Sequence, residues 1–134
     1  MVYQLGVLSM IKTFNTAKAP KAIGPYSQAV ISNGFIFTAG QICLIPETGL
    51  LNNKCFMDEV KQVLSNVNII LEEAGSGISN IIKCNVFITD LENFNIVNQV
   101  FEKTFKENYP ARAVVEVSKL PRNVNIEIDV IASI

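Results

Sequence analysis

The sequence predicts an α+β fold in which two helices pack on one face of a mixed β-sheet. Three observations lead to this prediction. The Asn33-Gly34 pair lies between two apolar runs, and this is the strongest short-range signal for a β-hairpin. Two later stretches, 57–75 and 93–109, repeat apolar residues at helical spacing. Other apolar segments alternate with a period of two, as strands do.

The first part of the chain is expected to be mostly strand. Residues 11–16 alternate as an edge strand, and 18–25 form a loop marked by two prolines and a glycine. Strands are predicted at 27–32 and 35–42, on either side of the Asn-Gly turn. Residues 45–51 read as a further turn.

The stretch 57–75 is the clearest helix. Its apolar face is formed by Val60, Val63, Leu64, Val67, Ile70, Leu71 and Ala74. Asp58 and Glu59 suit the first turn of a helix, and Gly75 suits the position just after its end.

The second part of the chain is expected to continue as strand, helix and two strands. In the strand at 81–91 one face is predicted to carry Ile82, Cys84, Val86 and Ile88. The helix at 93–109 turns Phe94, Val97, Phe101 and Phe105 to one side. Two more strands follow at 111–117 and 124–132, so the predicted order is β-β-β-α-β-α-β-β.

Composition limits the class of protein. The 134 residues suit one domain, which we expect over 11–134, with 1–10 as an N-terminal extension. Hydrophobic residues make up 49% and charged ones 17%, which is typical of a chain with a core and with surface hidden between subunits. The net charge of −1 gives no electrostatic attraction to nucleic acid. Residues 1–10 are too short to span a bilayer and lack a signal-peptide pattern, so a cytoplasmic location is expected and an organellar one stays open.

The chain has no histidine, which excludes Ser–His–Asp and Cys–His catalysis and histidine-ligated metal sites. Acid–base chemistry must then use carboxylates, tyrosine, lysine, cysteine or water. Cys43, Cys55 and Cys84 are far apart and form no CxxC motif, so we expect free thiols that pack as small core residues. No metal site is expected.

Arg112 is the most informative charged residue, because alanines and valines surround it. Alternation places Arg112 and Val114 on one strand face, and Glu127 on the face of the last strand opposite its core residues. If these two strands pair, Arg112 meets a carboxylate on the sheet face away from the helices. That face, half apolar through residues such as Val114, would then pack between subunits. A solvated ion pair and a site for a small carboxylate are both open.

Three further residues are candidates for a binding site. Tyr26 follows a rigid Gly-Pro turn that either aims the phenol or simply packs it. Gly40 ends a strand, where glycine permits either a close ligand or a bulge. Asn98 lies beside the apolar face of its helix, where an exposed role is the alternative.

Five stretches, in order and at matching spacings, resemble the Rid family, also called the YjgF or L-PSP type, of reactive-intermediate (enamine/imine) deaminases. Their sequences are AIGPYSQAV, TAGQI, DLENFNIVNQVF, YPARAVVEVSKLP and IEIDVIA, and the resemblance covers roughly 11–133. The resemblance implies a chorismate-mutase-like fold and a homotrimer with an inner β-barrel and three sites between subunits. No cofactor is implied.

The resemblance also implies roles for individual residues. Arg112 would clamp the substrate carboxylate, Tyr26 would line the pocket, and Gly40 would face the ligand with its backbone. Asn98 would belong to the same site, and Glu127 would act with the attacking water. Val114 departs from the family pattern, because many members have Cys, Ser or Thr there, so only its backbone N–H is available to a ligand.

The implied activity is hydrolysis of short 2-enamino or 2-imino acids, such as 2-aminoacrylate, to 2-keto acids and ammonia. Two alternatives come from other classes of function. A ribonuclease or translation inhibitor is disfavoured, because the chain lacks histidine and a basic stripe. A trimer that binds metabolites or unfolded clients without catalysis would use the same cleft, and the sequence does not separate it from a deaminase.

Overall fold

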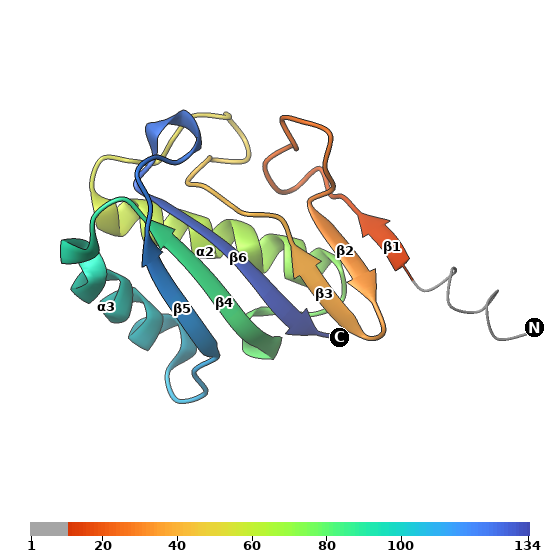
Figure 1. Cartoon of the computed structure of the whole chain (residues 1–134). Helices are drawn as coiled ribbons and strands as arrows, with labels where there is room; N and C mark the ends of the chain where they lie inside the picture. Colours follow the sequence, from red (N-terminus) through yellow and green to blue (C-terminus); the bar gives the residue numbers. More distant parts are fainter. Residues whose placement is uncertain (1–10) are drawn as a thin grey trace, which may run out of the picture.

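Residues 11–134 are described here from a computed structural model of the chain (Figure 1). The predicted extension at 1–10 lies outside the described residues. The strands form one six-stranded sheet in the order β1-β2-β3-β6-β4-β5, with α2 and α3 packed on one face. This is the α+β architecture that the sequence predicts.

The first three strands form an antiparallel meander of β1 (Ile11–Phe14), β2 (Ala29–Ser32) and β3 (Phe35–Thr38). Asn33 and Gly34 connect β2 and β3 with φ angles of 52° and 79°. Two consecutive positive φ angles are what a type I′ hairpin turn requires, and Asn-Gly adopts them at little cost. The predicted hairpin is therefore confirmed.

The remaining elements follow in the predicted order. They are α2 (Phe56–Glu73), the 3₁₀ turn η1 (Ile78–Asn80), β4 (Ile81–Ile88), η2 (Leu91–Asn93), α3 (Phe94–Phe105), β5 (Ala111–Glu116), η3 (Pro121–Asn123) and β6 (Ile126–Ser133). β6 runs antiparallel to β3 and β4, whereas β4 and β5 are parallel, so the sheet is mixed.

The core lies between the sheet and the two helices. The predicted apolar face of α2 is buried, apart from Ala74, which is partly exposed. α2 ends in a Schellman motif, because the Gly75 N–H donates to Glu72 O and the Ser76 N–H donates to Leu71 O. Gly75 thus has the predicted role.

Two expectations about side chains need correction. Ile82 is exposed, because a register shift between Ile81 and Lys83 turns Ile81 toward the core in its place. Cys43 and Cys84 are buried free thiols as expected, but Cys55 is exposed just before α2. Asp58 and Glu59 lie in the first turn of α2 as predicted, and Glu59 is only 1% exposed, so it is a core carboxylate.

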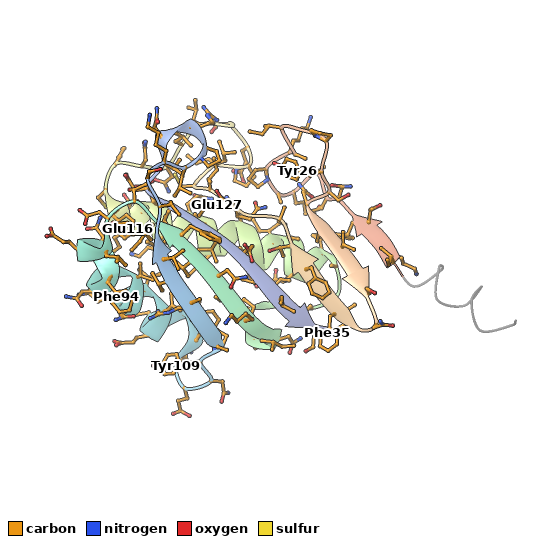
Figure 2. The ribbon with its side chains drawn as sticks, in the orientation of Figure 1. Tyr26, Phe35, Phe94, Tyr109, Glu116 and Glu127 are labelled. Atoms are coloured by element: carbon orange, nitrogen blue, oxygen red, sulfur yellow. The ribbon has the colours of Figure 1, made fainter. Side chains whose placement is uncertain are left out.

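The opposite face of the sheet has no helix over it among residues 11–134 (Figure 1). It displays Phe35, Phe37 and Val115 with 42%, 43% and 45% of their surface exposed. Figure 2 shows Phe35 near the lower end of this sheet face. Neither helix in the described part of the chain has the length and apolar character that crossing a membrane requires.

Candidate functional site

Arg112 lies on the helix side of the sheet. In the β4–β5 register Arg112 is opposite Cys84, whose side chain is buried in the core, so both point toward the helices. The Arg112 Nη2 donates a hydrogen bond to Asn98 Oδ1 on α3 at 2.8 Å. The guanidinium carbon also lies 5.2 Å from the ring centre of Phe94 and 4.9 Å from that of Phe101. Helix α3 therefore holds the arginine by one amide and two aromatic rings.

This arrangement corrects the prediction that Arg112 meets a carboxylate on the open face. The strand β4 lies between β5 and β6, so the two strands do not pair. Val114 likewise faces the helices, opposite Val86, and packs against the core. The open face is nevertheless half apolar, because Phe35, Phe37 and Val115 take the part expected of Val114.

The guanidinium opens into a cavity of about 400 Å³, which we call the arginine cavity. It is lined by Asn98, Phe101, Glu102, Tyr109, Pro110 and Arg112. Among residues 11–134 no carboxylate lies within salt-bridge distance of Arg112. A guanidinium with a neutral partner retains N–H groups that can bind a carboxylate in a bidentate manner. Phe94 is 37% exposed, because it covers the arginine rather than the core.

A second cavity of about 400 Å³ lies near one end of the sheet, and we call it the glutamate cavity. Its lining includes Tyr26, Gly40, Gln41, Ile42, Leu44, Pro121 and Glu127. Loops from three parts of the chain gather at this end, and Figure 2 shows Tyr26 and Glu127 there. The structure thus brings Tyr26, Gly40 and Glu127 together.

Gly40 has a steric reason to be glycine. A Cβ atom at this position would overlap Oε1 of Glu127, so the carboxylate packs directly on the glycine Cα. A close neighbour of Gly40 in this chain is therefore a side chain from β6.

Glu127 is tuned toward its neutral form. Burial raises the pKa of its carboxyl above the ordinary value, and the negative charge of Asp129 on the same strand raises it further. Asp129 itself accepts a hydrogen bond from Asn85 Nδ2 at 2.8 Å. A raised pKa brings a carboxyl closer to the working range of a general acid–base catalyst.

Tyr26 is placed by a tight turn. Its N–H donates to Gly24 O at 2.9 Å, and its hydroxyl accepts a long hydrogen bond of 3.4 Å from the Ile23 N–H. Gln28 anchors the preceding loop, because its buried amide accepts from the Thr16 N–H and donates to Pro20 O. The phenol is about half exposed and lines the cavity.

Four buried polar side chains near the site were not identified from the sequence, and these are Gln28, Gln41, Glu59 and Asn66. Asn66 on α2 donates to Ile42 O and Leu44 O at 3.1 and 2.8 Å, and both of these residues line the glutamate cavity. The burial of Glu59 and Asn66 could have been predicted from their positions, because both lie on the apolar side of a strongly periodic helix. Among residues 11–134, no group of three or more cysteine and acidic side chains is arranged to hold a metal ion.

The two cavities belong to opposite faces of the sheet. Arg112 shares the helix face with Cys84, whereas Glu127 is opposite Phe87 on β4, on the other face. Within the described part of one chain, Arg112 and Glu127 therefore do not line a common cavity.

Comparison with known proteins identifies relatives over nearly the whole chain. The family model described as Endoribonuclease L-PSP matches residues 16–134. A human 2-iminobutanoate/2-iminopropanoate deaminase is 43% identical over 121 residues, which cover 90% of this chain and 88% of the relative.

Solved structures agree with the fold. The crystal structure of the E. coli YjgF gene product has a TM-score of 0.86 at 43% identity and covers 91% of this chain and 98% of its own. The crystal structure of E. coli TdcF with bound serine has a TM-score of 0.86 at 41% identity and covers 92% and 98%. The chain therefore belongs to the L-PSP family, also called Rid or YjgF.

Proposed function

We propose that this protein is a deaminase that hydrolyses short 2-imino and 2-enamino acids, such as 2-aminoacrylate, to 2-keto acids and ammonia. The observation that carries the proposal is the environment of Arg112. Its charge is held by Asn98, Phe94 and Phe101, with no acidic partner in salt-bridge distance among residues 11–134. Such a guanidinium suits the carboxylate that every 2-imino acid carries. The name of the human relative and the serine bound to TdcF support the same substrate class.

Glu127 supplies the proton chemistry in this proposal. The carboxylate takes a proton from water as the water oxygen adds to the imine carbon, and it passes this proton to the imine nitrogen to give a carbinolamine. The regenerated carboxylate then takes the carbinolamine hydroxyl proton and delivers it to the amine nitrogen, so that the C–N bond breaks as the C=O bond forms, and ammonia leaves with the 2-keto acid. The raised pKa of Glu127 fits both steps. Tyr26 lines the same cavity and orients the water or the substrate.

Asn98 acts through Arg112, and Gly40 acts through Glu127. Asn98 fixes the orientation of Arg112 through its 2.8 Å hydrogen bond, and is therefore a positioning residue. Gly40 leaves room for the Glu127 carboxylate over its Cα. The side chain of Val114 packs against the core, so Val114 would contact a ligand only through its backbone N–H.

The complete site is proposed to form between copies of the chain in a homotrimer. The arginine and glutamate cavities lie on opposite faces of one sheet, so a neighbouring copy must supply one of them. The exposed Phe35, Phe37 and Val115 give the open face the apolar character of a subunit interface. Packing three such faces together would form an inner β-barrel.

A coupled assay tests the proposal. A serine or threonine dehydratase generates the enamine in place, and release of pyruvate or 2-ketobutyrate is timed with and without this protein. We expect the wild type to accelerate release, and Arg112→Ala to lose at least about 100-fold in kcat/KM, because a bidentate charged hydrogen bond is removed. Arg112→Lys keeps the charge without the planar fork, so a loss of about tenfold is expected.

The two variants must keep the wild-type oligomeric state and melting temperature for this comparison. Full activity in Arg112→Ala would overturn the role of the arginine. No acceleration by a folded, trimeric wild type would overturn the deaminase and favour a binding role for the same cavities.

A further inference from the structure

A buried carboxylate, Glu59, lies behind the glutamate cavity. Its Oε1 accepts a hydrogen bond from the Asn125 N–H at 2.9 Å, and its Oε2 accepts one from Asn125 Nδ2 at 2.9 Å. The Cys43 thiol lies 3.7 Å from the same Oε1. Burial and the nearby Glu59 together raise the pKa of Cys43 to about 11, so the thiol is protonated at neutral pH and can donate. Glu59 is 1% exposed and has no cation within salt-bridge distance in the described part of the chain.

The partners of Glu59 belong to two walls of the glutamate cavity. Cys43 lies between Ile42 and Leu44, and both of these line the cavity. Asn125 lies between two other lining residues, Pro121 and Glu127. One carboxylate on α2 therefore ties together, from the core side, the segments that carry the cavity lining.

The segment that contains Asn125 needs such a tie. Arg122 and Asn123, in the turn just before it, both have φ of 56°. Left-handed backbone at residues other than glycine persists where the surroundings strongly determine the conformation. Asn125 is also fixed by Thr89, whose Oγ1 donates to Asn125 Oδ1 at 3.0 Å and whose N–H donates to Asn125 O at 3.1 Å.

We propose that Glu59 is a positioning residue, which holds the two walls so that the Glu127 carboxyl stays packed over Gly40 inside the cavity. A contribution of Glu59 to catalysis rests on the proposed function, whereas its effect on the position of Glu127 does not. A buried carboxylate is retained at a cost unless its oxygens are satisfied, and here both oxygens accept hydrogen bonds from the segment that it positions.

The test measures Glu127 itself. The ¹³C signal of its carboxyl, assigned by its loss in Glu127→Gln, is titrated by NMR in the full-length protein. In Glu59→Leu we expect the pKa of Glu127 to fall toward its ordinary value by on the order of half a pH unit, because loosened walls admit water to the carboxyl. The other groups that face Glu127 are Tyr26 and Lys21 in the cavity and Asp129 on β6, and all are unchanged in this variant.

Glu59→Gln separates position from charge. The side-chain oxygen of a glutamine at position 59 can still accept from the Asn125 N–H. If the Asn125 side-chain amide flips, its Oδ1 can accept from the glutamine Nε2, and its Nδ2 can donate to the Thr89 hydroxyl. We therefore expect Glu59→Gln to leave the pKa of Glu127 within about 0.2 unit of wild type. Val63→Ala, on the same helix, is the matched control: it lowers the melting temperature by creating a core cavity, yet it should leave the titration unchanged.

Three outcomes would overturn the proposal: an unchanged titration in Glu59→Leu, an equal shift in Glu59→Gln, or an equal shift in Val63→Ala. If Glu59→Leu does not fold, Asn125→Ala replaces it, because Asn125 is exposed and its side chain carries one of the two bonds to Glu59. A smaller shift in the same direction is then expected, and an unchanged titration would overturn the proposal. These readouts require no turnover, so they stand apart from the test of the deaminase.

Discussion

At the scale of single residues, the surroundings of Arg112 and Glu127 have opposite effects on charge. Arg112 keeps its charge among neutral partners, namely the Asn98 amide and two aromatic rings. Glu127 is moved toward its neutral form, because its cavity removes water and Asp129 adds a like charge. In the proposed reaction, the fixed cation would bind the substrate carboxylate and the carboxyl would transfer the protons.

The raised pKa of Glu127 predicts how stability depends on pH. A carboxyl whose folded-state pKa is raised contributes stability below its unfolded pKa of about 4.3, and that contribution is lost as pH rises through the folded-state pKa. Glu127→Gln does not ionise, so its stability should exceed that of wild type at pH 8 and match it at pH 3.5. Because the side chain is partly exposed, we expect a difference of at most about 1 kcal/mol at pH 8.

Urea denaturation of the two proteins at both pH values measures this difference. Glu107→Gln, on the exposed turn after α3, is the control for the loss of one negative charge. A difference between Glu127→Gln and wild type that is the same at both pH values would contradict a raised pKa.

At the scale of the elements, local sequence predicted most of what the structure contains. The Asn33-Gly34 turn and the periodicity of 57–75 identified the hairpin and α2, because both depend on neighbours in the chain. The ends of elements were less predictable. The strand expected over 35–42 ends at Thr38, and the helix expected over 93–109 ends at Phe105, where Lys106 turns to a φ of 60°. The burial of Glu59 was not predicted, because its partner Asn125 is 66 residues away in sequence.

Gly40, in the segment after β3, packs against the Glu127 side chain of β6, and this contact predicts the effect of Gly40→Ala. The new methyl group would overlap the end of the Glu127 side chain, which is flexible and can rotate away. We therefore expect a stability loss below about 1 kcal/mol, but a fall in kcat of roughly tenfold or more, because the carboxyl leaves its position.

Thermal unfolding and the coupled assay measure the two effects of Gly40→Ala separately. Gly49→Ala is a useful comparison, because its Cβ would meet no atom within 4 Å although its φ of 71° makes it a strained site. A loss of stability in Gly40→Ala with undiminished kcat would contradict the steric role of this glycine.

At the scale of the whole molecule, the sequence predicted the layers but not the faces of the site. Alternation correctly separated the two sides of β5 and of β6. It did not reveal that β4 lies between them, because strand order depends on contacts between distant segments. Arg112 was therefore expected on the open face, and the structure places it beneath α3. The resemblance implied roles for these residues without this geometry.

The separation of the two cavities leads to the central claim, that a complete site takes Arg112 from one copy and Glu127 from another. It is tested most directly by mixing Arg112→Ala and Glu127→Gln subunits. Each variant alone should be inactive in the coupled assay. In a cyclic trimer of mixed composition, one of the three interfaces pairs an intact arginine with an intact glutamate, so mixed trimers isolated by two different tags should recover about one third of wild-type activity. Mixed trimers that are no more active than either variant alone would contradict a site shared between copies.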